Sequence, residues 1–289
     1  MLKGSIVALI TPFKDASLDE ENYIKLIDYH LKNGTNGIVP GGTTGESPTL
    51  SHNEHRKIIE ISVKECNSKI PVIAGTGSNS TDEAIELSKF AEKAGTDALL
   101  IVTPYYNKPT QEGLYQHYKK INDNVGTPIV IYNIPSRSVI DMTIETMTKL
   151  FELKNIIGVK DATGDLKRVE LQKKSMGSEF IQLTGNDDNA LEFNKLGGVG
   201  AIGVTANIAA KLSSEFQKAC VEDIAKATEL NKILQPLHSA MFIESNPSPV
   251  KYAASLLKMC NSNVRLPLVE VEETSKQKIS NALKVAKLL

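Results

Sequence analysis

Short apolar runs recur along the first part of the chain, and segments with helical spacing of apolar positions separate them. The runs are the length of single strands and contain many Val, Ile and Leu residues, which is typical of strands buried on both faces of a parallel sheet. Eight runs are present, at 5–11, 37–40, 71–74, 98–103, 128–132, 156–160, 180–184 and 200–204. The clearest helical segments between them are 21–32, 52–66, 82–94 and 112–124.

This alternation of strand and helix predicts right-handed βαβ units and a parallel sheet. Eight units within about 200 residues match a closed (β/α)8 TIM barrel better than an open sheet. A doubly wound open sheet is the alternative, but the turn after the first run, Thr11–Asp15, has no GxGxxG sequence.

The pattern becomes purely helical after residue 204, where helices are predicted over 208–221, 224–242, 249–259 and 271–289. Asn246–Pro249 is interpreted as a hinge or helix start, because proline disfavours helix at the residue before it. We therefore predict an α/β fold with a (β/α)8 barrel over residues 1–222 and a C-terminal helical region over 223–289.

Composition and charge are those of an ordinary globular protein. Of the 289 residues, 41% are apolar and 23% charged, and the formal net charge is −1. No block of like charge is long enough for a nucleic-acid surface, and the basic pairs Lys167–Arg168 and Lys173–Lys174 are interpreted as solvated helix faces.

Cys66, Cys220 and Cys260 lack the spacing of a zinc site. No apolar run approaches the roughly 20 residues of a membrane span, and the first residues lack a full signal-peptide layout. We expect a cytoplasmic protein that binds neither nucleic acid nor membranes.

Lys160 lies in the apolar run Ile156–Ala162, and a cation in an interior strand needs a chemical explanation. Burial penalises the ammonium form, and a neutral lysine amine can attack a carbonyl to form a Schiff base. This interpretation predicts an aldolase-type enzyme. The structural alternative is a lysine whose stem packs on apolar neighbours while its amine reaches water or Asp161.

Polar residues also follow the second run, and the C-terminal ends of strands are where the active sites of barrels lie. The segment Gly41–Ser47 reads GGTTGES. Its glycines let backbone amides approach an anion, and its adjacent hydroxyls can bind a carboxylate or relay protons. The structural alternative is a glycine-rich turn in which Ser47 or Thr49 caps the next helix.

The fourth and fifth runs are followed by phenol and guanidinium groups, among them Tyr106, Tyr132 and Arg137. A tyrosine hydroxyl near a neutral lysine can carry protons during imine formation, and an arginine offers a forked set of donors to a carboxylate. Taken singly, Tyr132 reads as a core residue and Arg137 as a loop charge. Their joint placement with Lys160 at one rim of the predicted barrel favours a catalytic site.

Three segments of the chain resemble signature segments of the dihydrodipicolinate synthase and N-acetylneuraminate lyase superfamily, namely 41–47, 132–138 and 158–163. The resemblance runs the full length of the chain. Thr43 beside Thr44, together with Arg137, favours the synthase branch over the sialic-acid lyases, whereas Ser136 stands where glycine is more usual.

The resemblance implies condensation of pyruvate with L-aspartate 4-semialdehyde to 4-hydroxy-tetrahydrodipicolinate, in lysine and diaminopimelate biosynthesis. It implies that Lys160 forms the imine with pyruvate and that Tyr132, Thr44 and Tyr106 form a proton relay. Tyr106 would come from a neighbouring subunit, within a homotetramer built as a dimer of dimers. No metal or organic cofactor is implied, because the lysine–pyruvate imine is itself the electron sink that makes the pyruvate methyl group acidic.

Substrate contacts are implied in the same way. Thr43 and Thr44 would bind the carboxylate of pyruvate, and Arg137 the carboxylate of aspartate semialdehyde. Gly185 and Ile202 would add backbone contacts near the imine.

The resemblance also implies a second site, a cleft at a dimer interface where L-lysine acts as a feedback inhibitor. Its lining positions would be Ser47, His52, His55, Asn79, Glu83 and Tyr105. Pro48 and Ser80 differ from the alanines common in the family. Without the resemblance, the shared helix face of His52 and His55 suggests a metal pair without an evident third ligand, or plain surface histidines.

Two other functions remain open from the sequence. The first is another pyruvate-dependent aldolase, such as an N-acetylneuraminate or keto-sugar-acid lyase; Arg137 is the discriminating residue, because it suits a carboxylated aldehyde more than a polyol. The second is a non-catalytic barrel that acts as a binding protein. It would be expected to lack Lys160 or Tyr132, and both are present.

Overall fold

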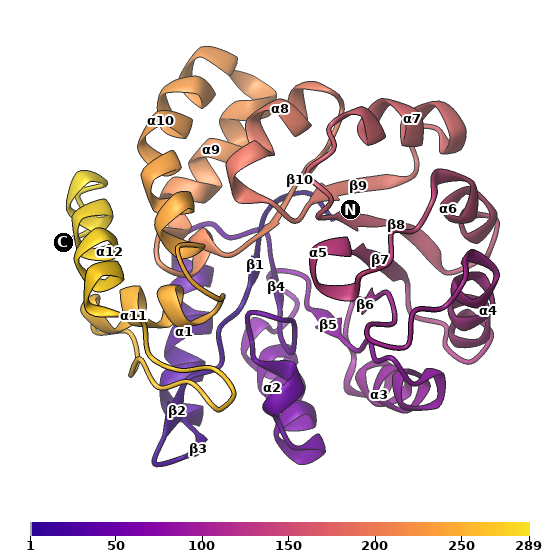
Figure 1. The fold of residues 1–289 in the computed structure, drawn as a ribbon, viewed down its shortest axis with the longest axis horizontal. Coiled ribbons are helices and arrows are strands. Elements are labelled where there is room, and N and C mark those ends of the chain that lie inside the picture. The colour runs from indigo at the N-terminus through magenta and orange to yellow at the C-terminus, as the bar shows by residue number, and fades with distance from the viewer. Residues whose placement is uncertain (1) are drawn as a thin grey trace.

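Eight parallel strands surround a common axis in the structure, a computed structural model that describes residues 2–289 (Figure 1). The strands are β1 (Gly4–Ala8), β4 (Gly37–Val39), β5 (Ile73–Gly75), β6 (Ala98–Val102), β7 (Ile129–Asn133), β8 (Ile156–Asp161), β9 (Ile181–Thr184) and β10 (Gly200–Gly203). Their order in the sheet is β4-β1-β10-β9-β8-β7-β6-β5, and a parallel bridge between Ile38 and Val72 joins the two ends. The predicted (β/α)8 barrel is confirmed.

Helices form the outer layer of the barrel, as Figure 1 shows. They are α1 (Glu20–Lys32), α2 (His52–Cys66), α3 (Thr81–Ala94), α4 (Gln111–Asn122), α5 (Pro135–Ser138), α6 (Ile144–Phe151), α7 (Lys167–Met176), α8 (Ala190–Lys195) and α9 (Ala210–Glu222). The C-terminal helices are α10 (Ile224–Met241), α11 (Ser248–Leu256) and α12 (Glu273–Val285). Within residues 2–289 no helix is both long and apolar enough to cross a membrane. The sequence patterns missed the short hairpin of β2 (Phe13–Lys14) and β3 (Ser17–Leu18).

Successive side chains of each strand point alternately into the barrel and toward the helices, which divides the apolar core into an inner and an outer layer. Leu100 and Tyr132 belong to the cluster that fills the barrel, whereas Leu99 and Ile131 pack outward against helices. A third cluster joins α1 to the C-terminal helices, and it contains Ile27 as well as Ile279. The C-terminal region therefore shares its apolar core with the barrel.

The start of α2 corrects one expectation. Neither Ser47 nor Thr49 caps this helix, because both lie in a 3₁₀ turn that precedes it. Ser51 is the N-cap: its Oγ accepts from the backbone N–H of Glu54 at 3.2 Å, and the Glu54 carboxylate accepts from the N–H of Ser51 at 2.8 Å. This reciprocal capping box satisfies two backbone donors that a helix start leaves free.

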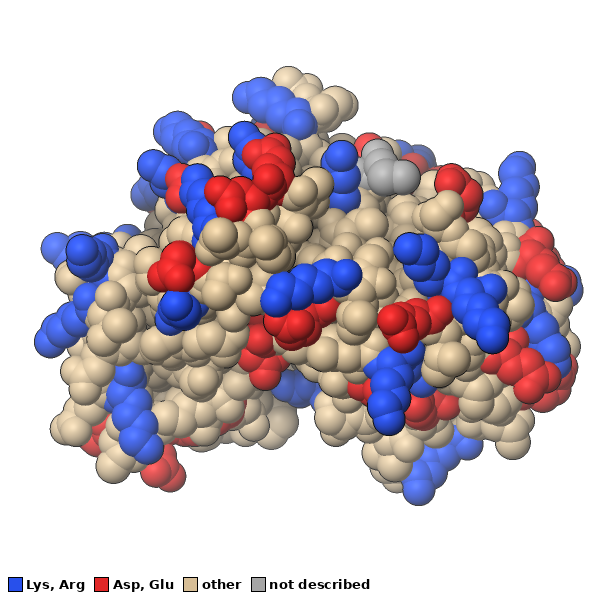
Figure 2. Space-filling view, turned by 90° about the horizontal axis from the view of Figure 1, so that it is seen from above, with Lys and Arg blue, Asp and Glu red and all other residues tan. Residues whose placement is uncertain are grey.

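Charged side chains of both signs are interspersed over the face drawn in Figure 2, without an extended patch of one sign.

Candidate active site

Lys160 lies on β8, and its side chain is only 6% exposed. In the parallel ladder it stands opposite Tyr132 of β7, and its Nζ lies 4.1 Å from the centroid of the Tyr132 ring. Asp161 does not hold the amine, because its carboxylate binds Arg168 and Gln172 instead. The structural alternative in which the Lys160 amine reaches Asp161 is therefore wrong. A buried lysine on an aromatic face with no carboxylate partner is not committed to an ion pair, so its amine is free to act as a nucleophile toward a carbonyl once its proton is removed.

Gly185 lies beside this lysine, and Ile202 lies in the inner layer of the barrel. A Cβ at Gly185 would come 3.0 Å from Lys160 Cε and 2.7 Å from the Cβ of Ala162, so glycine is needed to leave the lysine stem in place. Ile202, on β10, belongs to the same inner cluster as Tyr132. The structure thus places Gly185 against Lys160, and Ile202 in the cluster that contains Tyr132.

Thr43 and Thr44 lie on the loop that follows β4. The loop begins at Gly41, whose φ of +67° is one that glycine adopts without strain. Thr44 is buried, and its Oγ1 accepts a hydrogen bond from Asn246 Nδ2 at 3.0 Å. Thr43 is half-buried and faces a neighbouring cavity.

Glu46, on the same loop, forms a fully buried ion pair with Lys251 of α11, with 2.6 Å between Oε1 and Nζ. Its other carboxylate oxygen accepts from the backbone N–H of Arg265 at 2.9 Å. Burial lowers the pKa of Lys251, and the charge of Glu46 opposes that shift. This pair is not among the residues predicted from the sequence, although Lys251 stands in an apolar helical segment as Lys160 stands in an apolar strand, and that signal could have identified it.

Arg137 lies on α5, just after β7, with its side chain exposed at the rim. Its Nη2 donates to the backbone carbonyl of Asn246 at 3.4 Å. Asn246 therefore contacts both Thr44 and Arg137, and it is itself buried. From the sequence this segment is interpreted as a hinge or helix start, and α11 does begin at Ser248. Its role depends on a contact across more than one hundred residues, which a local pattern does not reveal.

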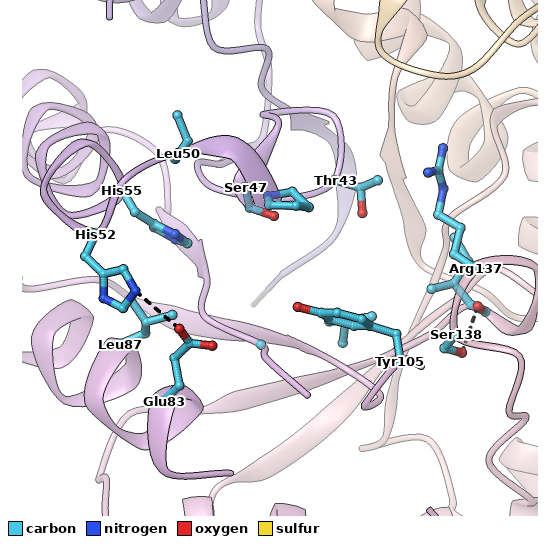
Figure 3. Close-up of a pocket in the computed structure, with 14 residues that line it drawn as sticks. Thr43, Ser47, Leu50, His52, His55, Glu83, Leu87, Tyr105, Arg137 and Ser138 are labelled. Atoms are coloured by element: carbon cyan, nitrogen blue, oxygen red, sulfur yellow. Dashed lines mark hydrogen bonds and ion pairs between the residues drawn. The ribbon is translucent and has the colours of Figure 1, made fainter. Parts of the chain in front are cut away.

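A cavity of about 410 Å³ adjoins the loop and the rim (Figure 3). Its lining includes Thr43, Arg137, Ser47, His52, His55, Glu83 and Tyr105. Lys160, Tyr132 and Thr44 do not line it, so the cavity does not enclose the Lys160–Tyr132 pair. Asn79 is also outside the lining, but its Nδ2 donates to the carbonyl of Tyr105 at 3.2 Å.

The two histidines of this cavity differ in their surroundings. His52 is exposed, and its Nε2 lies 3.3 Å from Glu83 Oε1, the pair joined by a dashed line in Figure 3. His55 is buried, burial lowers its pKa, and its Nε2 donates to the carbonyl of Gly75 at 2.7 Å. The interpretation of His55 as a surface histidine is therefore wrong. Residues 2–289 contain no cluster of three or more His, Cys, Asp or Glu that would hold a metal.

Tyr106 is the predicted relay residue that this chain does not bring to the others. Its side chain is 89% exposed, and its φ of +74° is unusual for a residue with a bulky side chain. The structure thus gathers Lys160, Tyr132, Gly185 and Ile202 in the barrel, with Thr44 at the adjacent loop.

Comparison with known proteins gives the same family throughout. Residues 1–286 match the model of the dihydrodipicolinate synthetase family. The chain is 69% identical to the 4-hydroxy-tetrahydrodipicolinate synthase of Pelagibacter ubique, over all of both chains. It is 45% identical to a chloride-inhibited dihydrodipicolinate synthase from Acinetobacter baumannii solved with pyruvate, with a TM-score of 0.98 over all of both chains. It is 34% identical to the enzyme from Cyanidioschyzon merolae solved with lysine bound, with a TM-score of 0.96 over 99% of both chains.

Proposed function

The chain belongs to the dihydrodipicolinate synthetase family, and from this membership we propose how its residues carry out the reaction. The chain is a lyase that condenses pyruvate with L-aspartate 4-semialdehyde to 4-hydroxy-tetrahydrodipicolinate. The observation that supports the proposed chemistry best is Lys160: a buried amine over the Tyr132 ring, with no acidic partner.

In the proposed mechanism the neutral Lys160 amine attacks C2 of pyruvate, and the C2 oxygen leaves as water to give an imine. The imine withdraws electrons from C3, so a C3 proton is lost and an enamine forms. The enamine carbon attacks the aldehyde carbon of aspartate semialdehyde, whose oxygen takes up a proton. The substrate's own amine then attacks the imine carbon, which closes the ring and frees Lys160. No metal or organic cofactor enters these steps.

The proton transfers need a group next to the lysine, and Tyr132 is the one that the ladder places there. Thr44 extends the relay, since a hydroxyl can accept one proton and donate another. Tyr106 of a second copy of the chain would complete it. We therefore propose that the active unit contains at least a dimer, within a homotetramer arranged as a dimer of dimers.

The two substrate carboxylates go to different groups in this proposal. Thr43 and Thr44 would bind the carboxylate of pyruvate through their hydroxyl and backbone groups. Gly185 and Ile202 would add backbone contacts near the imine. Arg137 would bind the carboxylate of aspartate semialdehyde through its exposed guanidinium. We assign the chemistry to the barrel, residues 1–222, and support of the Thr44 loop to residues 223–289, in a cytoplasmic enzyme.

Trapping of the imine tests the mechanism. Wild type, Lys160→Ala and Lys251→Met are mixed with pyruvate and borohydride, and their intact masses are measured. We expect a reduced pyruvyl adduct on wild type and on Lys251→Met, and none on Lys160→Ala. Wild type should then turn over aspartate semialdehyde. An adduct without condensation would move the substrate toward the lyases, and the absence of an adduct on wild type would overturn the Schiff-base mechanism.

We also propose that the cavity beside the rim binds L-lysine as an inhibitor. Its Glu83 carboxylate suits an ammonium group, and His52 and Tyr105 add polar groups around it. The related enzyme from Cyanidioschyzon merolae was solved with lysine bound. Partial inhibition by L-lysine, normalised to each variant's own uninhibited rate, should weaken in His55→Ala and in Glu83→Ala. Unchanged inhibition in both variants would reject this site.

A further inference from the structure

The two catalytic strands carry a second pair of neighbouring residues, directed away from the barrel axis. Tyr132 pairs with Lys160 in the ladder, and the next residues, Asn133 and Asp161, pair in turn. Because side chains alternate along a strand, the second pair faces the helical layer while the first faces the barrel interior. Asn133 and Asp161 are nevertheless almost completely buried, so their polar atoms need partners within the protein.

Arg168, in the first turn of α7, supplies most of these partners. Its Nε donates to Asp161 Oδ2 at 2.9 Å, its Nη1 to Asp141 Oδ2 at 3.2 Å and its Nη2 to the carbonyl of Met142 at 2.8 Å. All three guanidinium nitrogens are thus engaged, on two separate chain segments. The interpretation of Arg168 as part of a solvated helix face is wrong, since the residue is 9% exposed.

Asn133 closes this network into a ring. Its Nδ2 donates to Asp141 Oδ1 at 2.7 Å, and its Oδ1 accepts from the N–H of Met142 at 3.0 Å. The ring therefore runs from Asn133 of β7 through Asp141 and Arg168 to Asp161 of β8, and the ladder between the two strands completes it.

Asp161 is held from a second direction as well. Its Oδ1 accepts from the N–H of Thr163 at 2.9 Å and from the Thr163 hydroxyl at 2.6 Å. Gln172 Nε2 donates to Oδ2 at 3.0 Å. A carboxylate with this many donors has one orientation, so the backbone of the residue next to Lys160 is fixed with it.

We propose that Arg168 is a positioning residue that, with Asp141, sets the relative placement of Lys160 and Tyr132. The ring crosses β7 and β8 at the residues that immediately follow the catalytic pair, so movement of either strand end would break a buried charged contact. Stability alone is a weak reason to keep such a contact, because desolvation of a buried ion pair commonly offsets its attraction. Placement is a stronger reason, since a shift of about 1 Å in a reacting group can cost about 100-fold in rate.

The test measures the rate of borohydride-dependent trapping of pyruvate, together with kcat and both KM values, in Arg168→Lys and Asp141→Asn. Arg168→Lys retains the charge but cannot span Asp161, Asp141 and the Met142 carbonyl at once. We expect trapping and kcat to fall together by about 10- to 100-fold in this variant, with the KM for aspartate semialdehyde changed far less. Asp141→Asn keeps the shape of this half-exposed side chain but turns one acceptor oxygen into a donor, so it loses the contact to either Arg168 or Asn133 and should show a smaller fall of the same kind.

Ile58→Ala is the matched control, because it removes a buried side chain of α2 from the cluster that joins α1 to the C-terminal helices, and so lowers stability without touching the ring. It should trap pyruvate at the wild-type rate below its unfolding temperature. Wild-type trapping rates in both Arg168→Lys and Asp141→Asn would overturn the proposal, and so would an equal loss in the Ile58→Ala control. The inference rests on the Schiff-base function, and the experiment distinguishes failure of the one from failure of the other. Absence of an adduct on wild type rejects the function. An adduct that the variants form as fast as wild type rejects only the positioning role.

Discussion

The chain buries two lysines over aromatic rings, and their surroundings differ in one respect. Lys160 Nζ lies 4.1 Å from the centroid of the Tyr132 ring, and Lys251 Nζ lies 4.2 Å from that of Phe13. Lys251 also has a carboxylate partner, Glu46, at 2.6 Å, whereas the carboxylate next to Lys160 in sequence is occupied by Arg168.

This difference accounts for the roles that we propose, a structural one for Lys251 and a chemical one for Lys160. A buried ammonium needs a countercharge, so an ion-paired lysine is committed to its partner. An aromatic face alone satisfies the charge less completely and leaves the amine able to exchange its proton with a neighbouring hydroxyl. Both lysines are thus buried in apolar segments, and the presence or absence of a carboxylate partner is what distinguishes the roles proposed for them.

The largest effect is expected at Tyr132. Tyr132→Phe keeps the ring under the amine but removes the group proposed to carry protons. General acid–base groups contribute about 10²- to 10⁴-fold, so kcat and the trapping rate should fall within that range. Steady-state kinetics and borohydride trapping measure both.

Tyr23→Phe is the matched control for that prediction, because Tyr23 is also buried but its hydroxyl hydrogen-bonds Ser62 Oγ, in the contact between α1 and α2 and away from Tyr132. It should leave the trapping rate unchanged. If the two tyrosine variants trap pyruvate equally fast, the relay does not run through Tyr132.

Removal of the cation at the other lysine should affect stability instead. Lys251→Met leaves the Glu46 carboxylate buried without its partner, which costs about 3–5 kcal/mol of the free energy of unfolding. Urea denaturation measures this loss, and the folded variant should still form the pyruvate adduct. A stable Lys251→Met protein that forms no adduct would contradict the division of roles.

The double variant Glu46→Gln/Lys251→Met sharpens the same comparison, since it removes both charges. It should regain most of the stability lost in Lys251→Met, because no unpaired charge remains and the introduced amide still offers an oxygen to the Arg265 N–H. The free energies of unfolding of wild type, both single variants and the double variant complete the cycle. Simple addition of the two single losses would show that the pair is not coupled.

Acid should weaken the helical layer, by a smaller amount for each buried histidine. Burial lowers the pKa of His30 to about 3 and that of His117 to about 4, and the Nε2 of each lacks a hydrogen-bond partner. Between these pKa values and the value of about 6.5 in the unfolded chain, the unfolded chain binds more protons than the folded protein. The contribution of the two histidines to the free energy of unfolding is therefore complete above pH 6.5 and falls as the pH decreases.

Urea denaturation at pH 7 and pH 5 should show a loss of about 2 kcal/mol for each of these histidines. In His117→Asn the loss should shrink by the contribution of that residue. An unchanged free energy of unfolding between the two pH values would contradict burial of neutral histidines.

Much of the architecture was predictable because it depends on local pattern. All eight barrel strands and the clearest helices were located within a few residues, since apolar periodicity and strand length are properties of a short segment. The Ser51 cap was missed because Ser47 and Thr49 offer the same hydroxyl, and Pro48 and the left-handed Glu46 turn the chain before the helix begins.

The sequence by itself determined the barrel, the placement of Lys160 on an interior strand and the family, because these depend on periodicity and on short motifs. Only the tertiary structure decided that Asn246 meets Thr44, that Lys251 neutralises Glu46 and that Arg168 is buried behind Lys160. The physical reason is that a charged residue has the same local pattern whether it faces solvent or a partner. Its role depends on which residues the closed barrel brings within hydrogen-bonding distance, and some of these lie more than two hundred positions away.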